Sequence, residues 1–210
     1  MPHRITRPQS RILGGVLVGG ASSRMGTPKA ALTWRGRTLL DIAVAALAST
    51  VREVALLGDP PAPADGTGPA GPLRRIPDPP DLKGPLAGIL AALRAEPDAV
   101  WIVAACDQPW MCSAAVEWLL DQRRPDRWAV LPRGADGRVE PMPALYEPRV
   151  RPVLEAMAGR GELAPRALAA APGVATPEIP AEIRRAWISV NTPEEYERLR
   201  KGPQGGASDR

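Results

Sequence analysis

Three glycines and two cations lie between Leu17 and Lys29, directly after the first apolar run of the chain. Glycine lets a backbone approach an anion closely, and free N–H groups in such a loop can cradle phosphate. Arginine suits forked contact with phosphate oxygens, whereas lysine supplies a compact point charge. The segment matches neither a Walker A loop, nor Gly-x-Gly-x-x-Gly, nor a Gly-x-Ser-x-Gly elbow. It predicts a phosphate-binding loop, the alternative being a structural turn with two solvated bases; its chemical residues are Gly19, Gly20, Arg24, Gly26 and Lys29.

Asp107 follows the most apolar run of the chain, Ala99–Ala105. A carboxylate at the end of a strand is well placed to hold Mg²⁺, which prefers oxygen ligands and bridges phosphates. Capping of the next helix is the alternative role for this aspartate. Cys106 is expected to be a buried apolar residue, because the only histidine of the chain is His3 and a nucleophilic thiol needs a base.

A third polar segment, Ser189-Val-Asn191-Thr-Pro-Glu-Glu195, lies near the end of the chain. Thr192 before a proline is a good helix start, and two glutamates in the first turn favour it further. Capping explains the residues from Thr192 to Glu195 and leaves Asn191 available for a ligand.

The elements that must position these residues alternate between strand and helix patterns. This alternation predicts a three-layer αβα domain with a mostly parallel, Rossmann-like sheet over 11–201, flanked by disordered tails at 1–10 and 202–210. Ligands of such sheets bind beyond the carboxyl ends of the strands. The expected strands are Ile12–Val18, Val54–Leu57, Ala99–Ala105, Ala129–Leu131, Pro143–Tyr146 and Trp187–Val190. The expected helices are Thr38–Leu47, Leu86–Leu93, Ala114–Leu120, Val150–Ala158, Leu163–Ala170 and Pro193–Lys201, with 58–72 as a loop.

Composition excludes several classes of function. The 210 residues carry 27 basic and 23 acidic side chains, and the scattered arginines do not form the patch that nucleic-acid binding needs. No apolar run approaches the roughly 18 residues of a membrane span, and no secretory signal is evident. With two cysteines and no such signal, the chain is expected to be cytoplasmic with reduced thiols.

Taken together, the motifs resemble the molybdenum cofactor guanylyltransferase family, within the wider group of GT-A-like nucleotidyltransferases. The resemblance covers about 11–200, and the segment from Leu17 to Ala31 matches the signature loop of that group. Gly84-Pro-Leu-Ala-Gly88 points to the guanylyl branch, and Glu140–Tyr146 matches a characteristic strand. Ser189 stands where the family often carries asparagine, and Pro28 where it often carries aspartate.

The resemblance implies transfer of GMP from GTP to Mo-molybdopterin, with release of pyrophosphate and with Mg²⁺ as cofactor. Arg24 and Lys29 would contact the triphosphate, and Asp107 would hold the metal. Asn191 and Ser189 would bind the acceptor. The nucleotide would be bound by Leu17, Gly19, Gly20, Gly26, Lys29, Asp78, Gly84, Pro85, Leu86 and Gly88.

Two alternatives remain at this stage. A CTP-dependent cytidylyltransferase would share the fold and the loop and differ only in base recognition. A non-catalytic nucleotide-binding or cofactor-handover protein could use the same scaffold, although the residues expected for phosphate and metal binding are all present. The family also implies contact with other molybdenum-cofactor assembly proteins, and no membrane or nucleic-acid partner is expected.

Overall fold

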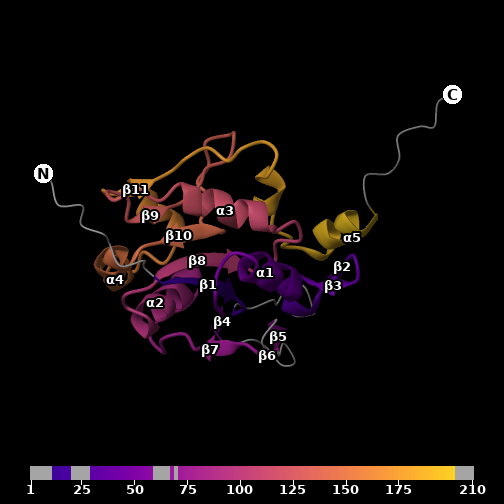
Figure 1. Ribbon diagram of the computed structural model, residues 1–210, viewed down its shortest axis with the longest axis horizontal. Coiled ribbons are helices and arrows are strands. Elements are labelled where there is room, and N and C mark those ends of the chain that lie inside the picture. The colour runs from indigo at the N-terminus through magenta and orange to yellow at the C-terminus, as the bar shows by residue number, and fades with distance from the viewer. Residues whose placement is uncertain (1–10, 20–28, 59–66, 69–70, 202–210) are drawn as a thin grey trace, which may run out of the picture.

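A seven-stranded sheet forms the centre of the protein in the computed structural model, which describes residues 11–19, 29–58, 67–68 and 71–201. Its strand order is β11-β9-β10-β8-β1-β4-β7, and Figure 1 shows the sheet between layers of helices. Two short hairpins, β2-β3 and β5-β6, lie outside this sheet. The strands are β1 (Ile12–Leu17), β2 (Thr33–Trp34), β3 (Arg37–Thr38), β4 (Val54–Leu57), β5 (Thr67–Gly68), β6 (Gly71–Pro72), β7 (Arg74–Ile76), β8 (Val100–Ala105), β9 (Ala129–Val130), β10 (Ala144–Tyr146) and β11 (Val174–Ala175).

Strand β1 lies at the point where the order of the sheet reverses. It pairs in parallel with β4 on one side and with β8 on the other, and Leu17 is in register with Leu57 and Ala105. Strand β7 extends the parallel part beyond β4, while β10 runs antiparallel to both β8 and β9. The prediction of a mostly parallel sheet is therefore confirmed. Such a reversal point opens a crevice at the carboxyl ends of the strands.

Helices cover both faces of the sheet and enclose two separate apolar cores. Helices α1 and α3 pack with one core, and α2 and α4 pack with the other (Figure 1). The predicted three-layer architecture is confirmed, and within the described parts of the chain no helix is long and apolar enough to cross a bilayer. The α-helices are α1 (Leu39–Ala48), α2 (Pro85–Ala95), α3 (Ser113–Asp121), α4 (Arg151–Gly159) and α5 (Pro193–Lys201). The 3₁₀ helices are η1 (Lys29–Ala31), η2 (Pro148–Val150), η3 (Pro165–Ala170) and η4 (Arg184–Trp187).

Local signals start three of the helices as the sequence predicts. The Thr38 hydroxyl caps α1 by accepting a hydrogen bond of 3.0 Å from the backbone N–H of Asp41. Helix α2 begins at Pro85, a residue that suits the first helical turn because its missing N–H is not needed there. Helix α5 begins at Pro193 behind Thr192, and its bounds agree with the prediction.

Two expectations about strands and loops were wrong. Part of the segment 58–72 forms the β5-β6 hairpin instead of loop, and β7 follows it at the edge of the sheet. Trp187–Val190 is not a strand. The apolar Trp187 side chain is used in tertiary packing instead. Its ring makes an edge contact with Trp118, with centroids 5.7 Å apart, and its indole N–H donates to the Pro143 carbonyl at 2.9 Å. Strand β11, which forms the edge of the sheet beside β9, was not predicted, because its two residues are too few to show a pattern.

The predicted helix Leu163–Ala170 is a 3₁₀ helix that begins at Pro165. Ala171 precedes Pro172 and has an extended backbone, which is the conformation that a following proline favours. The segment is therefore too short for a regular α-helix.

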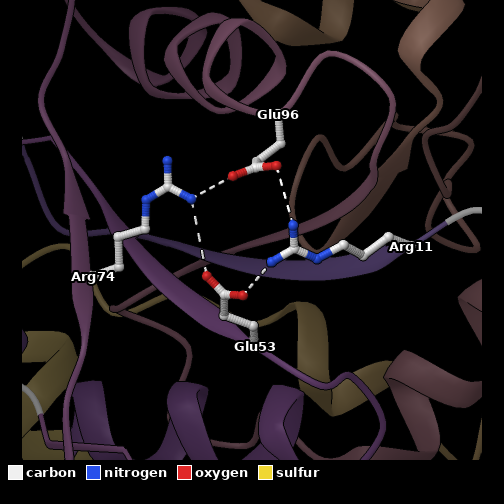
Figure 2. A network of polar contacts seen from close by, with 4 residues as sticks. All are labelled: Arg11, Glu53, Arg74 and Glu96. Atoms are coloured by element: carbon white, nitrogen blue, oxygen red, sulfur yellow. Dashed lines mark hydrogen bonds and ion pairs between the residues drawn. The ribbon is translucent and has the colours of Figure 1, made fainter.

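Four charged residues form a cluster at the end of the sheet where the parallel strands begin. Figure 2 shows Arg11, Glu53, Arg74 and Glu96 in a closed ring of alternating charges. Arg11 contacts Glu96 at 3.2 Å and also pairs with Glu53, while Arg74 contacts Glu53 at 3.9 Å and Glu96 at 2.5 Å. Because the ring links the beginnings of β1, β4 and β7 to the end of α2, it stabilises the end of the sheet that lies away from the expected ligand site.

Candidate active site

A pocket opens where the parallel strands end and α2 begins. It encloses about 290 Å³ of empty space, part of it open to solvent. Five of the residues predicted to bind nucleotide line it, and Leu57 adds a sixth wall residue from the end of β4. The lining residues are Leu17, Gly19, Leu57, Asp78, Gly84 and Pro85. The crevice predicted from the strand pattern therefore exists and contains much of the predicted nucleotide site.

Helix α2 points its first turn into this pocket. Gly84 has a φ of 81°, a conformation that glycine adopts at little cost, and this turn directs the chain into Pro85. The first N–H groups of a helix lack partners within the helix and favour an anion. Phosphate or ribose oxygens bound here would meet that positive end.

Leu86 and Gly88, also predicted to bind nucleotide, lie behind the pocket wall. Leu86 is fully buried in the core under α2. A Cβ atom added to Gly88 would lie 2.4 Å from Cδ2 of Leu17 and 3.3 Å from Cβ of Leu57. Gly88 thus allows α2 to pack closely on β1 and β4, which shapes the wall that Leu17 and Leu57 present to the pocket.

Lys29 connects three segments that are far apart in the sequence. Its ammonium group donates to Oδ2 of Asp107 at 2.8 Å and to Oδ1 of Asn191 at 2.8 Å. The side chains of Lys29 and Asp107 are only 20% and 15% exposed. The structure therefore brings together three residues that the sequence analysis singled out separately, beside the end of β8.

Asp107 fits the chemistry of a magnesium ligand. Its second carboxylate oxygen, Oδ1, is buried and has no hydrogen-bond partner within the described residues. The alternative role as a helix cap is excluded, because α3 begins only at Ser113 and its N-cap is Cys112. No group of three or more His, Cys, Asp or Glu side chains that could hold a metal occurs in the described ranges. Mg²⁺ bound to nucleotide commonly uses one or two carboxylates and completes its shell with phosphate and water, so one aspartate fits this ion.

Asn191 is held in place by the cap of α5. Its backbone N–H donates to Oε2 of Glu195 at 2.6 Å, and the same oxygen accepts from Thr192 N–H at 3.2 Å. Thr192 in turn accepts from the Glu195 N–H at 3.2 Å, which completes a reciprocal capping box. Since capping uses the backbone of Asn191, its side chain stays available to contact Lys29. Val190 N–H donates to the Asp107 carbonyl at 2.9 Å and fixes this segment, with the half-buried Ser189, at the end of β8.

The cysteine beside Asp107 has a structural role. Cys106 is buried, and this burial, together with the neighbouring Asp107 carboxylate, raises the pKa of its thiol to about 12. The expectation of an apolar residue here is confirmed. Arg24, Gly20 and Gly26, all predicted to bind phosphate, lie outside the described residues.

Two further features of the site were not predicted from the sequence. The Tyr196 hydroxyl donates to the Thr33 carbonyl at 2.8 Å and accepts from the Thr33 N–H at 3.1 Å, which ties α5 to the strand that follows Lys29. Leu57 lines the pocket because β4 ends beside β1, and its position at a strand end was the only signal available.

Comparison with known proteins gives one family. A family model described as the MobA-like NTP transferase domain matches residues 14–174. A protein of Bacillus mycoides (strain KBAB4), named probable molybdenum cofactor guanylyltransferase, is 30% identical over 201 residues that cover 91% of this chain and 97% of that protein.

Solved structures show the same fold. The crystal structure of molybdopterin-guanine dinucleotide biosynthesis protein A from Archaeoglobus fulgidus superposes with a TM-score of 0.70 at 20% identity, covering 89% of this chain and 96% of that one. The 2-C-methyl-D-erythritol 4-phosphate cytidylyltransferase of Thermus thermophilus gives 0.59 at 20% identity, over 88% and 95% of the two chains. Because the family model and the Bacillus relative each span most of the sequence, the chain belongs to the MobA-like NTP transferase family.

Proposed function

We propose that the protein transfers GMP from GTP to Mo-molybdopterin, forming the molybdopterin guanine dinucleotide cofactor and pyrophosphate. The observation that carries this proposal is the meeting of Lys29, Asp107 and Asn191 at the end of β8, next to the pocket formed by β1, β4 and α2. The printed names of the guanylyltransferase relatives support the choice of substrates.

The reaction needs positioning and charge neutralisation rather than a covalent enzyme intermediate. An oxygen of the acceptor phosphate attacks the α-phosphorus of GTP and forms a new P–O bond. The bond between the α-phosphorus and the oxygen bridging to the β-phosphate breaks, and both electrons leave with pyrophosphate. Holding the two anionic reactants in line and stabilising the charge on the leaving group are the tasks of the protein.

Lys29 is proposed to neutralise the triphosphate, with Arg24 and the glycines of the loop beside it. In this role its ammonium group leaves Asp107 and donates to phosphate oxygens instead. Asn191 would then orient the acceptor, and Ser189, which precedes it by two residues, would contribute a hydroxyl on the same side.

Asp107 is proposed to hold Mg²⁺, since its buried Oδ1 has no protein partner in the described part of the chain. When bound, the ion neutralises charge on the α-phosphate and on the departing pyrophosphate. Asp107→Asn keeps the size and polarity of the side chain and removes the charge. This variant should lose the dependence of the rate on Mg²⁺ together with most of the turnover, whereas Asp121→Asn at the exposed end of α3 should not.

The pocket is proposed to take the nucleoside. Asp78 and Gly84 offer polar groups for the base or ribose, and Leu17 and Leu57 offer apolar walls. A pocket with apolar walls and few convergent polar groups is typical of a small-molecule site.

Thermal stabilisation by nucleotides is the first test. With Mg²⁺ present, GTP at about 100 times its dissociation constant should stabilise the fold by roughly 2.7 kcal/mol, or about 5–10 °C for a chain of this size. CTP, ATP and UTP at the same concentration should give smaller shifts. A larger shift with CTP would make the protein a cytidylyltransferase, and no shift with any nucleotide would favour a non-catalytic role.

Lys29→Ala should abolish most of the GTP shift and lower kcat/KM by about 10²- to 10³-fold, the usual effect of removing one group that stabilises developing charge. Lys201→Ala, in the last turn of α5, removes an equal charge from an exposed position and serves as the matched control. Equal behaviour of the two variants would contradict the role of Lys29.

A further inference from the structure

The three segments that meet at Lys29 also meet a second time, through aromatic rings and an arginine. Each segment carries one further residue of interest. Trp34 lies five positions after Lys29, Trp110 lies three after Asp107, and Arg185 lies six before Asn191. The rings of Trp34 and Trp110 make an edge contact with centroids 6.0 Å apart. The guanidinium of Arg185 lies over the ring of Trp110, 4.7 Å from its centroid. This second cluster, Trp34, Trp110 and Arg185, therefore borders the candidate active site.

Arg185 is exposed, and its guanidinium packs on a ring rather than pairing with a carboxylate of the described residues. A guanidinium stacked on an aromatic face keeps its N–H donors in its own plane, where they remain available for a further partner. Trp110 thus fixes the position of a charge without neutralising it. Forked contact with phosphate oxygens is the chemistry that such an arginine suits.

The cluster and the nucleotide pocket belong to opposite faces of the sheet. Helix η4, which carries Arg185, packs with the core shared by α1 and α3 through Ala186 and Trp187. The pocket is walled by Leu17 and Leu57, whose side chains belong to the core under α2. Lys29 and Asp107 lie at the end of the sheet that separates the two cores. An in-line displacement needs the attacking group and the leaving group on opposite sides of the phosphorus.

We propose that Arg185 binds the anionic part of the phosphorylated acceptor and that Trp110 is the positioning residue that holds it there. The inference rests on the proposed function and deepens it, because it adds an acceptor-specific cation to the one assigned to the triphosphate. The acceptor arrives with negative charge of its own, and a separate cation on its side allows it to approach a bound polyanion. Arg185 determines affinity for the acceptor and makes no contact with GTP.

Arg184 offers a matched control, since it is the preceding residue of η4, also exposed and also positively charged, with no aromatic ring beneath it among the described residues. Initial rates of guanylyl transfer would be measured against Mo-molybdopterin at saturating GTP, and against GTP at saturating Mo-molybdopterin. Arg185→Ala should raise the KM for Mo-molybdopterin by about 10- to 100-fold, as expected for the loss of hydrogen bonds to a charged group. The KM for GTP and the melting temperature should stay at the wild-type values, and Arg184→Ala should change none of these quantities.

Replacing Trp110 tests the positioning role. Trp110→Leu should raise the KM for Mo-molybdopterin in the wild-type background and add nothing in the Arg185→Ala background, because the two residues act as a unit. Arg185→Lys, which keeps the charge and loses the fork, should fall between wild type and Arg185→Ala.

The outcomes separate this inference from the proposed function. Suppose that the wild type transfers GMP and that Arg184→Ala and Arg185→Ala have the same KM for Mo-molybdopterin. This result would overturn the role of Arg185 and leave the guanylyltransferase activity in place. A rise in the KM for GTP would place Arg185 on the nucleotide instead of the acceptor. Failure of the wild type to transfer GMP at all would overturn the proposed function, and the inference with it.

Discussion

Lys29 contacts a carboxylate and an amide at the same time, so its charge is already shared in the absence of nucleotide. The two contacts of 2.8 Å fix the ammonium group between Asp107 and Asn191. A partly buried carboxylate left without a cation costs free energy, since desolvation penalises an unpaired charge. Lys29 therefore has a structural role of its own, and under the proposed function it would become available to phosphate once a metal ion neutralises Asp107.

The two cysteines of the protein should differ sharply in reactivity. Burial raises the pKa of Cys106 to about 12, so at pH 8 only about one thiol in ten thousand is ionised, and the thiolate is the reactive form. Cys112, at the start of α3, is partly exposed. Iodoacetamide at pH 8 should modify Cys112 in the native protein and Cys106 only after unfolding, as peptide mass spectrometry would report. Equal labelling of both in the native state would contradict the buried position of Cys106.

The contact between α2 and β1 determines the shape of the pocket. Gly88→Ala would place a Cβ atom 2.4 Å from Cδ2 of Leu17, so this side chain must turn, and Leu17 lines the pocket. The helix gains roughly 1 kcal/mol of propensity while overpacking costs about 1–3 kcal/mol, so the net loss of stability is about 2 kcal/mol at most. GTP affinity should fall by roughly tenfold, a loss of about 1.4 kcal/mol, as measured by calorimetry.

Gly159→Ala is the control for this variant. Gly159 ends α4, and a Cβ atom added there would meet nothing within 4 Å. The control should match or exceed wild-type stability and bind GTP normally. Normal GTP binding by Gly88→Ala as well would show that the packing of α2 on β1 does not set the pocket wall.

Elements with an explicit local signal were predictable, and elements that depend on distant packing were not. The bounds of α5 followed from Thr192 and Pro193, whose capping chemistry is local. In contrast, Trp187 has the apolar character of a strand residue but uses it in contacts with Trp118 and Pro143, which are far away in the sequence. The hairpin β5-β6 depends on the pairing of two dipeptides, and strand β7 depends on the edge that β4 offers; neither pairing produces a periodic pattern in the sequence.

The charge ring in Figure 2 joins distant parts of the whole molecule and should make its stability depend on pH. A hydrogen bond from Arg74, with a further contribution from Arg11, lowers the pKa of Glu96 below the ordinary value of 4.5. The unfolded chain therefore binds a proton at higher pH than the folded one. The stabilising effect is complete above about 4.5 and is lost as the pH falls through the lower pKa of the folded state.

Urea unfolding of the wild type and of Glu96→Gln at pH 7 and pH 3 would measure this effect. The wild type should be more stable at pH 7, and the difference should shrink at pH 3, because the Glu96 carboxylate binds protons increasingly as the pH falls below its ordinary pKa. Added NaCl at 1 M should reduce the difference at pH 7 as well, because exposed charges are screened. If the difference in the free energy of unfolding between the two proteins changed with neither pH nor salt, Glu96 would act through packing alone.

At the scale of the molecule, the sequence was informative about which residues take part in the site and less so about how they meet. Asp107 was singled out because it follows the most apolar run of the chain, and Asn191 because helix capping leaves it unexplained. Their joint contact with Lys29 depends on the order of strands in the sheet, which the alternation of elements does not specify. Arg185 and Trp110 gave no signal at all, since an arginine and a tryptophan 75 positions apart become a pair only when η4 folds back over the turn after β8.

The hydrogen bonds between Tyr196 and Thr33 join residues 163 positions apart, so they can form only late in the synthesis of the chain. At roughly 5–20 residues per second, the ribosome makes Tyr196 on the order of 10 to 30 s after Thr33. During that interval the ribosome makes β4, Asp78 and the start of α2, which together with the end of β1 line the pocket. Asn191 and its helix, which complete the other side, are among the last parts to emerge. All residues that line the pocket are therefore synthesised well before the segment that carries Asn191.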